Sequence, residues 1–199
     1  KISSSAFAEN AKIPKVYSKL GGNQRPPLEI NDVPTDTKSL VVVCHDPDAP
    51  GRDGFYHWTV WNLPSKTTEI TGESLPAGAV EGVTSWGRPG WNGPQPPFGT
   101  HRYQFYVYAL DGILDLPDST KPKELIAALT PHIIDQAVLT GRFGVLDILD
   151  GTRDLVILRI IYLTVSIKES ISESTNQIAE YLICVVNTHN PMLYLAATY

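Results

Sequence analysis

The stretch PPFGTHRYQFYVYAL, residues 96–110, begins as a proline-rich loop and continues as the clearest strand in the chain. From His101 onward, aromatic and β-branched residues dominate, as is typical of a strand. Side chains alternate between the two faces of a strand, so His101 and Tyr103 share one face, about 7 Å apart. Arg102 points to the opposite face, where we expect it to form a structural ion pair.

Two further segments predict strands on either side of a rigid loop. Residues 40–45, LVVVCH, are typical of a strand buried on both faces, and residues 55–61, FYHWTVW, indicate a second strand. Strict alternation would place Phe55, His57, Thr59 and Trp61 on one face, and Tyr56, Trp58 and Val60 on the other. The connecting loop starts with DPDAPG at residues 46–51, in which Ala49–Pro50 is a candidate cis peptide bond.

The other elements are predicted to be short. Residues 1–37 indicate edge strands and loops, and residues 86–99 indicate a long loop whose aromatic side chains pack. A helix is predicted over 121–129, a second short helix from Thr130-Pro131, and a closing strand over 137–143.

Composition narrows the classes of function. The chain has 199 residues and a formal net charge of -5, with no Lys/Arg cluster, which argues against nucleic-acid binding. The longest apolar stretch, residues 155–167, is too short to span a bilayer and contains Arg159. Cys44 and Cys184 are too few and too far apart to form a disulfide framework. We therefore expect a cytoplasmic protein, or a periplasmic one if a leader was removed.

Three segments, 46–51, 57–62 and 96–103, place ionisable residues at strand ends or loop mouths. His57, His101 and Tyr103 could donate hydrogen bonds to a phosphate-like anion. Asp46 and Asp48 could orient the histidines or accept from a ligand ammonium or hydroxyl, which favours a zwitterionic or hydroxylated phosphate ester. If binding needs protonated rings, affinity should fall as pH rises through about 6.5.

The same segments resemble the phosphatidylethanolamine-binding protein family, in its short prokaryotic, Raf kinase inhibitor-like branch. The resemblance rests on DPDAP at 46–50, on His57 followed by Asn62, and on PPFGTHRY running on to Tyr108-Ala109-Leu110. The opening residues and ALTPHIIDQAVLTGRFG, at 128–144, are also similar. The resemblance covers residues 1–144 and implies a mainly β fold, in which a large antiparallel sheet packs on a smaller sheet with a few short peripheral helices.

The resemblance also implies a ligand site and a function. The matching pocket positions are Asp46, Asp48, His57, His101 and Tyr103, with Pro97 and Gly99 lining the loop. From their position alone, Trp86 and Trp91 are expected to wall the entrance. Family members bind phosphate, phosphorylethanolamine and similar headgroups. The resemblance thus implies a non-enzymatic regulatory protein that binds a small anionic ligand without a cofactor or a metal.

Several alternatives remain open at this stage. The protein could inhibit a serine protease or a kinase through the pocket rim, residues 86–98. It could hydrolyse an ester, with Ser85, Thr100 or Cys44 as nucleophile by residue type alone. Two His and two Asp could instead bind zinc, although their spacing is unusual for it. His45 and His132 match no motif position and are expected to be structural or exposed.

Residues 145–199 match nothing in the family, and the sequence does not reveal the oligomeric state. This segment is either a genuine extra element or sequence read past the natural end of the frame, and no function is assigned to it.

Overall fold

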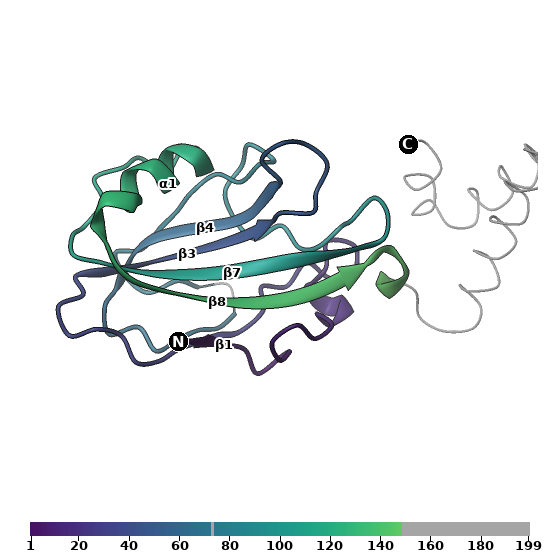
Figure 1. The fold of residues 1–199 in the computed structure, drawn as a ribbon, viewed down its shortest axis with the longest axis horizontal. Helices are drawn as coiled ribbons and strands as arrows, with labels where there is room; N and C mark the ends of the chain where they lie inside the picture. The colour runs from purple at the N-terminus through teal and green to yellow at the C-terminus, as the bar shows by residue number, and fades with distance from the viewer. Residues whose placement is uncertain (73, 149–199) are drawn as a thin grey trace, which may run out of the picture. The chain divides into compact units, whose positions relative to one another are not determined.

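The structure is a computed structural model that describes residues 1–72 and 74–148 (Figure 1). Lys1–Ile148 form one compact unit. Cys184 and almost all of the predicted extension over 145–199 lie outside the described residues. Within them, Val145–Ile148 form a single 3-10 turn, η3.

The described chain is mainly β, as the sequence predicts. The larger sheet has five strands in the order β6-β4-β3-β7-β8, and every neighbouring pair is antiparallel. A smaller antiparallel sheet has the order β1-β2-β5. The strand bounds are Ile2–Ser3 (β1), Leu28–Ile30 (β2), Ser39–Asp46 (β3), Phe55–Pro64 (β4), Glu69–Ile70 (β5), Val80–Glu81 (β6), Thr100–Leu110 (β7) and Ile133–Gly144 (β8).

The helices are short and lie at the periphery. Helix α1 covers Pro122–Leu129, and 3-10 turns cover Lys15–Tyr17 (η1) and Thr130–His132 (η2). Proline at the first helical position suits the start of α1, and Glu124 accepts a hydrogen bond from the backbone N–H of Lys121 at 3.1 Å. Leu125 and Leu129, one turn apart, are buried. The predicted helices at 121–129 and from Thr130 are both confirmed.

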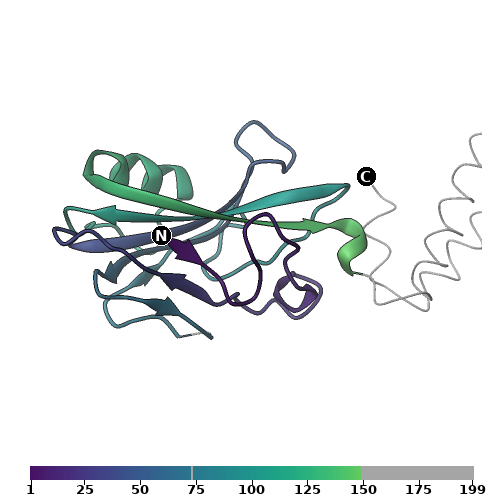
Figure 2. The same ribbon diagram turned by 60° about the horizontal axis from the view of Figure 1, so that its bottom comes forward.

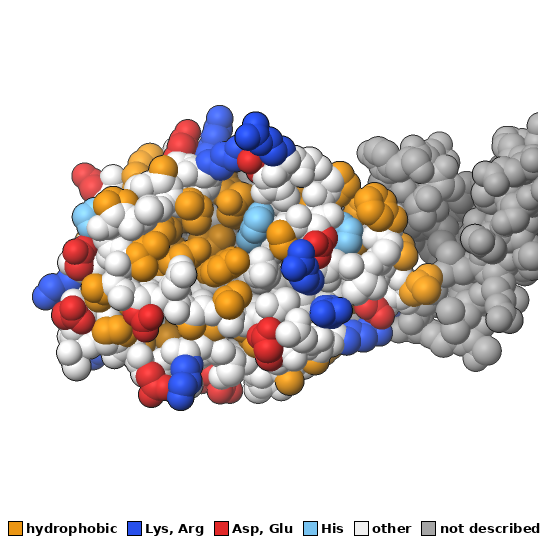
Figure 3. Space-filling view, viewed as in Figure 1, with side chains coloured by type: hydrophobic (Ala, Val, Ile, Leu, Met, Phe, Trp, Pro, Cys, Tyr) orange, Lys and Arg blue, Asp and Glu red, His pale blue; other side chains and the backbone are white. Residues whose placement is uncertain are grey.

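Figure 2 shows the smaller sheet lying on one side of the larger sheet. Two apolar clusters hold the layers together. One fills the space between the sheets and joins Leu28 and Ile70 of the smaller sheet to Val42 and Phe105 of the larger. The other lies on the opposite face of the larger sheet, under α1. On that outer face, hydrophobic side chains gather between α1 and β8 (Figure 3).

Strict alternation along β4 is wrong, and a register shift explains why. Cys44 pairs with Trp58 but His45 pairs with Tyr56, so His57 is an extra residue in β4. Tyr56 packs against the cluster on the outer face, whereas Trp58 and Val60, predicted to share its face, join the inter-sheet cluster. Such a bulge bends a strand and re-aims its side chains. His57 and Trp58 consequently share a face that a regular strand would not give them.

Two backbone findings complete the fold. Every peptide bond in the described residues is trans, so the expected cis bond at Ala49–Pro50 is wrong. None of the helices within these residues is both long and apolar enough to cross a membrane.

Candidate functional site

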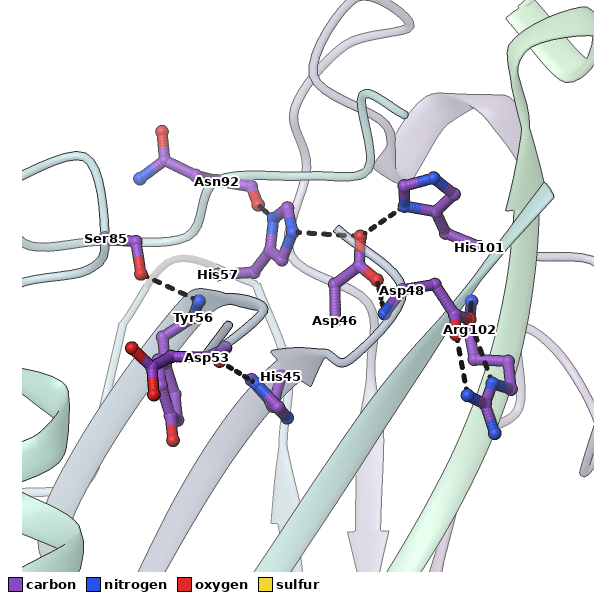
Figure 4. Close-up of polar contacts among 10 residues, drawn as sticks. All are labelled: His45, Asp46, Asp48, Asp53, Tyr56, His57, Ser85, Asn92, His101 and Arg102. Atoms are coloured by element: carbon purple, nitrogen blue, oxygen red, sulfur yellow. Dashed lines mark hydrogen bonds and ion pairs between the residues drawn. The ribbon is translucent and has the colours of Figure 1, made fainter. Parts of the chain in front are cut away.

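Three neighbouring strands bring the predicted polar residues together at one end of the larger sheet (Figure 4). Asp46 ends β3, His57 stands at the bulge of β4, and His101 and Tyr103 lie near the start of β7. All four side chains are buried, with exposed fractions of 5% or less. Buried polar groups normally have hydrogen-bond partners, so the contacts of these four residues indicate what the site can do.

Asp46 is the centre of the site. Its Oδ2 accepts a hydrogen bond from His101 Nδ1 at 2.7 Å, and its Oδ1 accepts from the backbone N–H of Asp48 at 2.8 Å. The first contact fixes the orientation of the His101 ring, and the second fixes the start of the proline loop. The expectation that an aspartate orients a histidine is thus met by Asp46.

The His57 side chain is held in place by the backbone of Asn92. Its Nδ1 lies 2.5 Å from the backbone oxygen of Asn92, and its Nε2 lies 4.0 Å from Asp46 Oδ2. Burial, which outweighs the favourable effects of Asn92 and Asp46, lowers the pKa of His57 to about 4. The ring is therefore neutral near pH 7. An affinity controlled by His57 protonation near pH 6.5 does not fit this geometry.

Two buried polar atoms of the site have no hydrogen-bond partner within the described residues: His101 Nε2 and the Tyr103 hydroxyl. The hydroxyl lies close to Asp46 and to the Gln95 backbone but meets neither with hydrogen-bond geometry. Burial first, and then the charge of Asp46, raise the pKa of Tyr103, so its phenol stays protonated. The Tyr103 ring stands edge-on to His57, with 5.1 Å between centroids.

Asp48 does not orient a histidine, which corrects the role expected for it. Both of its carboxylate oxygens bind the Arg102 guanidinium, at 2.6 and 2.9 Å, and one also accepts from the Arg102 backbone N–H. These hydrogen bonds lower the pKa of Asp48 to about 2. The ion pair expected for Arg102 is confirmed, and it ties the proline loop to β7.

The predicted entrance residues separate into two groups. Trp91 is only 8% exposed, stacks on Phe105 in the core, and donates its indole N–H to the Tyr17 carbonyl, so it does not wall an entrance. Trp86 is 51% exposed and stands edge-on to Phe55, whose ring in turn contacts His57. The prediction that the whole loop packs its aromatic residues is therefore wrong for Trp86.

The proline–glycine loop contributes a residue that was not predicted to contact the site. Pro97 and Gly99 are exposed. Phe98 lies between them, is 62% exposed, and meets the His101 ring edge-on at 5.8 Å between centroids. Gly99 has φ +61°, a conformation that glycine adopts without strain, and this favours the turn that presents Phe98.

Asn92 was also missed, because its contribution comes from a backbone carbonyl, which sequence patterns do not reveal. Its side chain accepts a hydrogen bond from Lys19 Nζ at 2.8 Å, and this contact ties down the loop that holds His57. The sequence of residues 86–99 indicated only a long loop.

The residues considered for other chemistries are placed as follows. Cys44 is fully buried, and burial raises the pKa of its thiol well above the usual value. The Ser85 hydroxyl accepts a hydrogen bond from the Tyr56 backbone N–H. His45 and His132 have structural or surface partners, the Asp53 carbonyl and the Asp111 carboxylate, as expected. Among residues 1–72 and 74–148 no cluster of three metal-ligating side chains is found.

Comparison with known proteins agrees with this fold. The family model for phosphatidylethanolamine-binding proteins matches residues 3–144. A UPF0098 protein of Methanothermobacter thermautotrophicus is 38% identical over 143 residues, which cover 69% of this chain and 94% of that protein. A UPF0098 protein of Chlamydia trachomatis is 39% identical over 146 residues, covering 71% and 97%.

Two crystal structures are also similar to this chain. The phosphatidylethanolamine-binding protein homologue CT736 of Chlamydia trachomatis has 38% identity and a TM-score of 0.68, covering 72% of this chain and 95% of its own. YbcL of E. coli, a member of the same family, has 30% identity and a TM-score of 0.70, covering 72% and 97%. The family match and these archaeal and bacterial relatives show that the chain belongs to the phosphatidylethanolamine-binding protein family.

Proposed function

We propose that this protein binds small phosphate-bearing ligands, such as phosphorylethanolamine, and acts without catalysing a reaction on them. One observation carries the proposal: His101 Nε2 and the Tyr103 hydroxyl are buried polar atoms without partners, at a site centred on Asp46. An unpaired buried polar group costs about 1–3 kcal/mol. A ligand that pairs with both atoms would remove this cost.

The ligand needs a way in, because both atoms are shielded from solvent. Phe98 is the side chain that stands against His101 while remaining mostly exposed. Displacement of Phe98 would uncover His101 with little loss of core packing. We therefore include movement of residues 97–99 in the proposed binding step.

An NMR titration with phosphorylethanolamine tests the proposal. We expect saturable shifts at residues around Asp46 in the native protein, and their loss in His101→Ala. The control is His132→Ala, which removes an exposed histidine that pairs with Asp111. A folded native protein that shows no shifts would overturn the proposal.

A second function is favoured by the exposed aromatic residues Trp86 and Phe98, which lie on two sides of the site. Large exposed aromatic side chains commonly anchor protein interfaces. They suit an inhibitor of a serine protease or a kinase that acts through the rim. If the rim acts alone, inhibition should survive His101→Ala and be lost in Trp86→Ala.

An ester hydrolase has less support. The fully buried thiol of Cys44, with its raised pKa, is a poor nucleophile. The test is release of product from phosphate or carboxylate esters, compared between the native protein and His57→Ala.

A further inference from the structure

The two histidines of the site present different hydrogen-bonding groups. A backbone carbonyl can only accept, so the His57 Nδ1 that lies 2.5 Å from the Asn92 oxygen must carry the hydrogen. In a neutral ring the other nitrogen, Nε2, then presents a lone pair. His57 is thus an acceptor toward a ligand, contrary to the donor role that its residue type suggests.

A second acceptor lies beside it. Asp46 Oδ2 is 4.0 Å from His57 Nε2, the pair that a dashed line joins in Figure 4, and this distance is too long for a hydrogen bond. A fully ionised anion at this point would face a lone pair and a carboxylate and would satisfy neither. The other side of the site differs, because the Tyr103 hydroxyl can donate.

Given the proposed function on which this inference rests, we propose that the site selects phosphate monoesters in their monoprotonated form. The P–OH group donates to His57 Nε2 or Asp46 Oδ2, and an unprotonated oxygen accepts from the Tyr103 hydroxyl. Sulfate esters have the same shape but carry no such hydrogen, so the site discriminates against them.

The groups around His57 favour a neutral imidazole ring from pH 5 to 8. Asp46 and His45 of β3 and His101 of β7 are the charged or titratable groups that act on it, and Tyr103 of β7 meets its ring. The loop at Asn92 contributes only a carbonyl and an amide. Since burial dominates and lowers the pKa of His57 to about 4, the ring keeps its lone pair from pH 5 to 8.

Three matched ligands test whether the site requires a hydrogen on the acid group of the ligand. Phosphorylethanolamine and 2-aminoethyl hydrogen sulfate have the same aminoethyl group, and at pH 5 both acid groups carry one negative charge. They differ there in the central atom and in the acidic hydrogen, which only the phosphate ester carries. A site built to accept a ligand hydroxyl rejects analogues that lack it by large factors. We expect calorimetry on the full chain at pH 5 to show binding at least ~10-fold tighter for the phosphate ester.

The third ligand, 2-aminoethylphosphonate, tests whether the proton belongs to the ligand. The second pKa of a phosphate ester is about 6, and a phosphonate loses its second proton at higher pH. If the ligand must carry the hydrogen, affinity falls as each acid loses its proton. The midpoint of the fall should then lie at higher pH for the phosphonate. A protein group such as His101 would give both ligands the same midpoint.

A variant removes the acceptor. His57→Gln presents an amide that can also donate, so the preference for phosphate over sulfate should shrink about tenfold. His132→Gln, at an exposed histidine, should leave the preference unchanged. If His57→Gln does not fold, the ligand series on the native protein still decides.

The outcomes are distinct. Tight phosphate binding, weak sulfate binding and a midpoint that follows the ligand support the inference. Equal binding of the sulfate ester, or one midpoint for both phosphorus ligands, overturns it and leaves the anion site intact. No binding of any ligand at any pH overturns the proposed function and this inference with it.

Discussion

His101 donates its Nδ1 hydrogen to Asp46 across 2.7 Å, and both side chains are only 3% exposed. Asp111 and His132 form a similar pair at 2.8 Å on the surface, with exposures of 60% and 46%. The protein thus contains a buried and an exposed version of one contact, whose energies should differ because water screens only the second.

The first prediction compares these two pairs. Asp46→Asn removes the charge that holds His101 and should lower the free energy of unfolding by about 2 kcal/mol. Asp111→Asn should lower it by less than about 1 kcal/mol. Urea unfolding at pH 7 measures both. Equal losses would show that burial does not strengthen the Asp46–His101 contact.

The second prediction concerns the unpaired Tyr103 hydroxyl. Tyr103→Phe removes a buried polar atom that lacks a partner, so stability should stay within about 0.5 kcal/mol of the native value or rise. Affinity for phosphorylethanolamine should fall about tenfold, because one donor is lost. Tyr106→Phe is the control, since its hydroxyl bonds Gln104 on the other face of β7. A large loss of stability in Tyr103→Phe would mean that the hydroxyl has a partner in solution.

The third prediction follows from the neutral, buried His57. Its pKa is about 4 when folded and about 6.5 when unfolded, so only the unfolded chain takes up a proton between these values. Acidification from pH 6.5 to 4 should therefore destabilise the fold by roughly 3 kcal/mol through this residue. Above pH 6.5 the contribution is complete. Urea midpoints should fall less steeply over this window in His57→Gln than in the native protein, whereas His132→Gln should follow the native curve.

The fourth prediction concerns the loop that starts at Asp46. A Cβ at Gly54 would lie 2.3 Å from the Asp46 backbone oxygen and 2.7 Å from His45 Nε2, whereas one at Gly51 would meet nothing within 4 Å. Both glycines have positive φ, +63° at Gly54 and +109° at Gly51, so the backbone strain of an added side chain is at least as large at Gly51. Gly54→Ala should cost at least about 2 kcal/mol more than Gly51→Ala in urea unfolding. Similar costs would show that the loop shifts freely.

The strands and the main helix could be predicted from the sequence because their signals are local. The alternation of His101 and Tyr103 in β7 was predicted correctly, as was the apolar spacing of α1. The bulge at His57 could not be predicted, because an inserted residue depends on the register with β3 and leaves no local pattern.

Residue types predicted several of the side chains that lie together but not the contacts of each one. Asp46 and Asp48 are equivalent in sequence, yet one faces His101 and the other faces Arg102, since successive loop residues point in different directions. Trp86 and Trp91 lie in one loop, but only Trp91 packs into the core. The contact between His57 and the backbone carbonyl of Asn92 could not be predicted from the types of side chain in the sequence.

The extra residue in β4 also determines which sequence changes the site can tolerate. Deleting one residue there would restore regular alternation and exchange the inward and outward side chains along one part of the strand. Either the His57 side chain would point away from Asp46, or the side chains of Trp58 and Val60 would point away from the inter-sheet core. The length of this segment is therefore as strict a requirement as its residue types, and a one-residue gap placed here in an alignment would pair chemically unrelated positions.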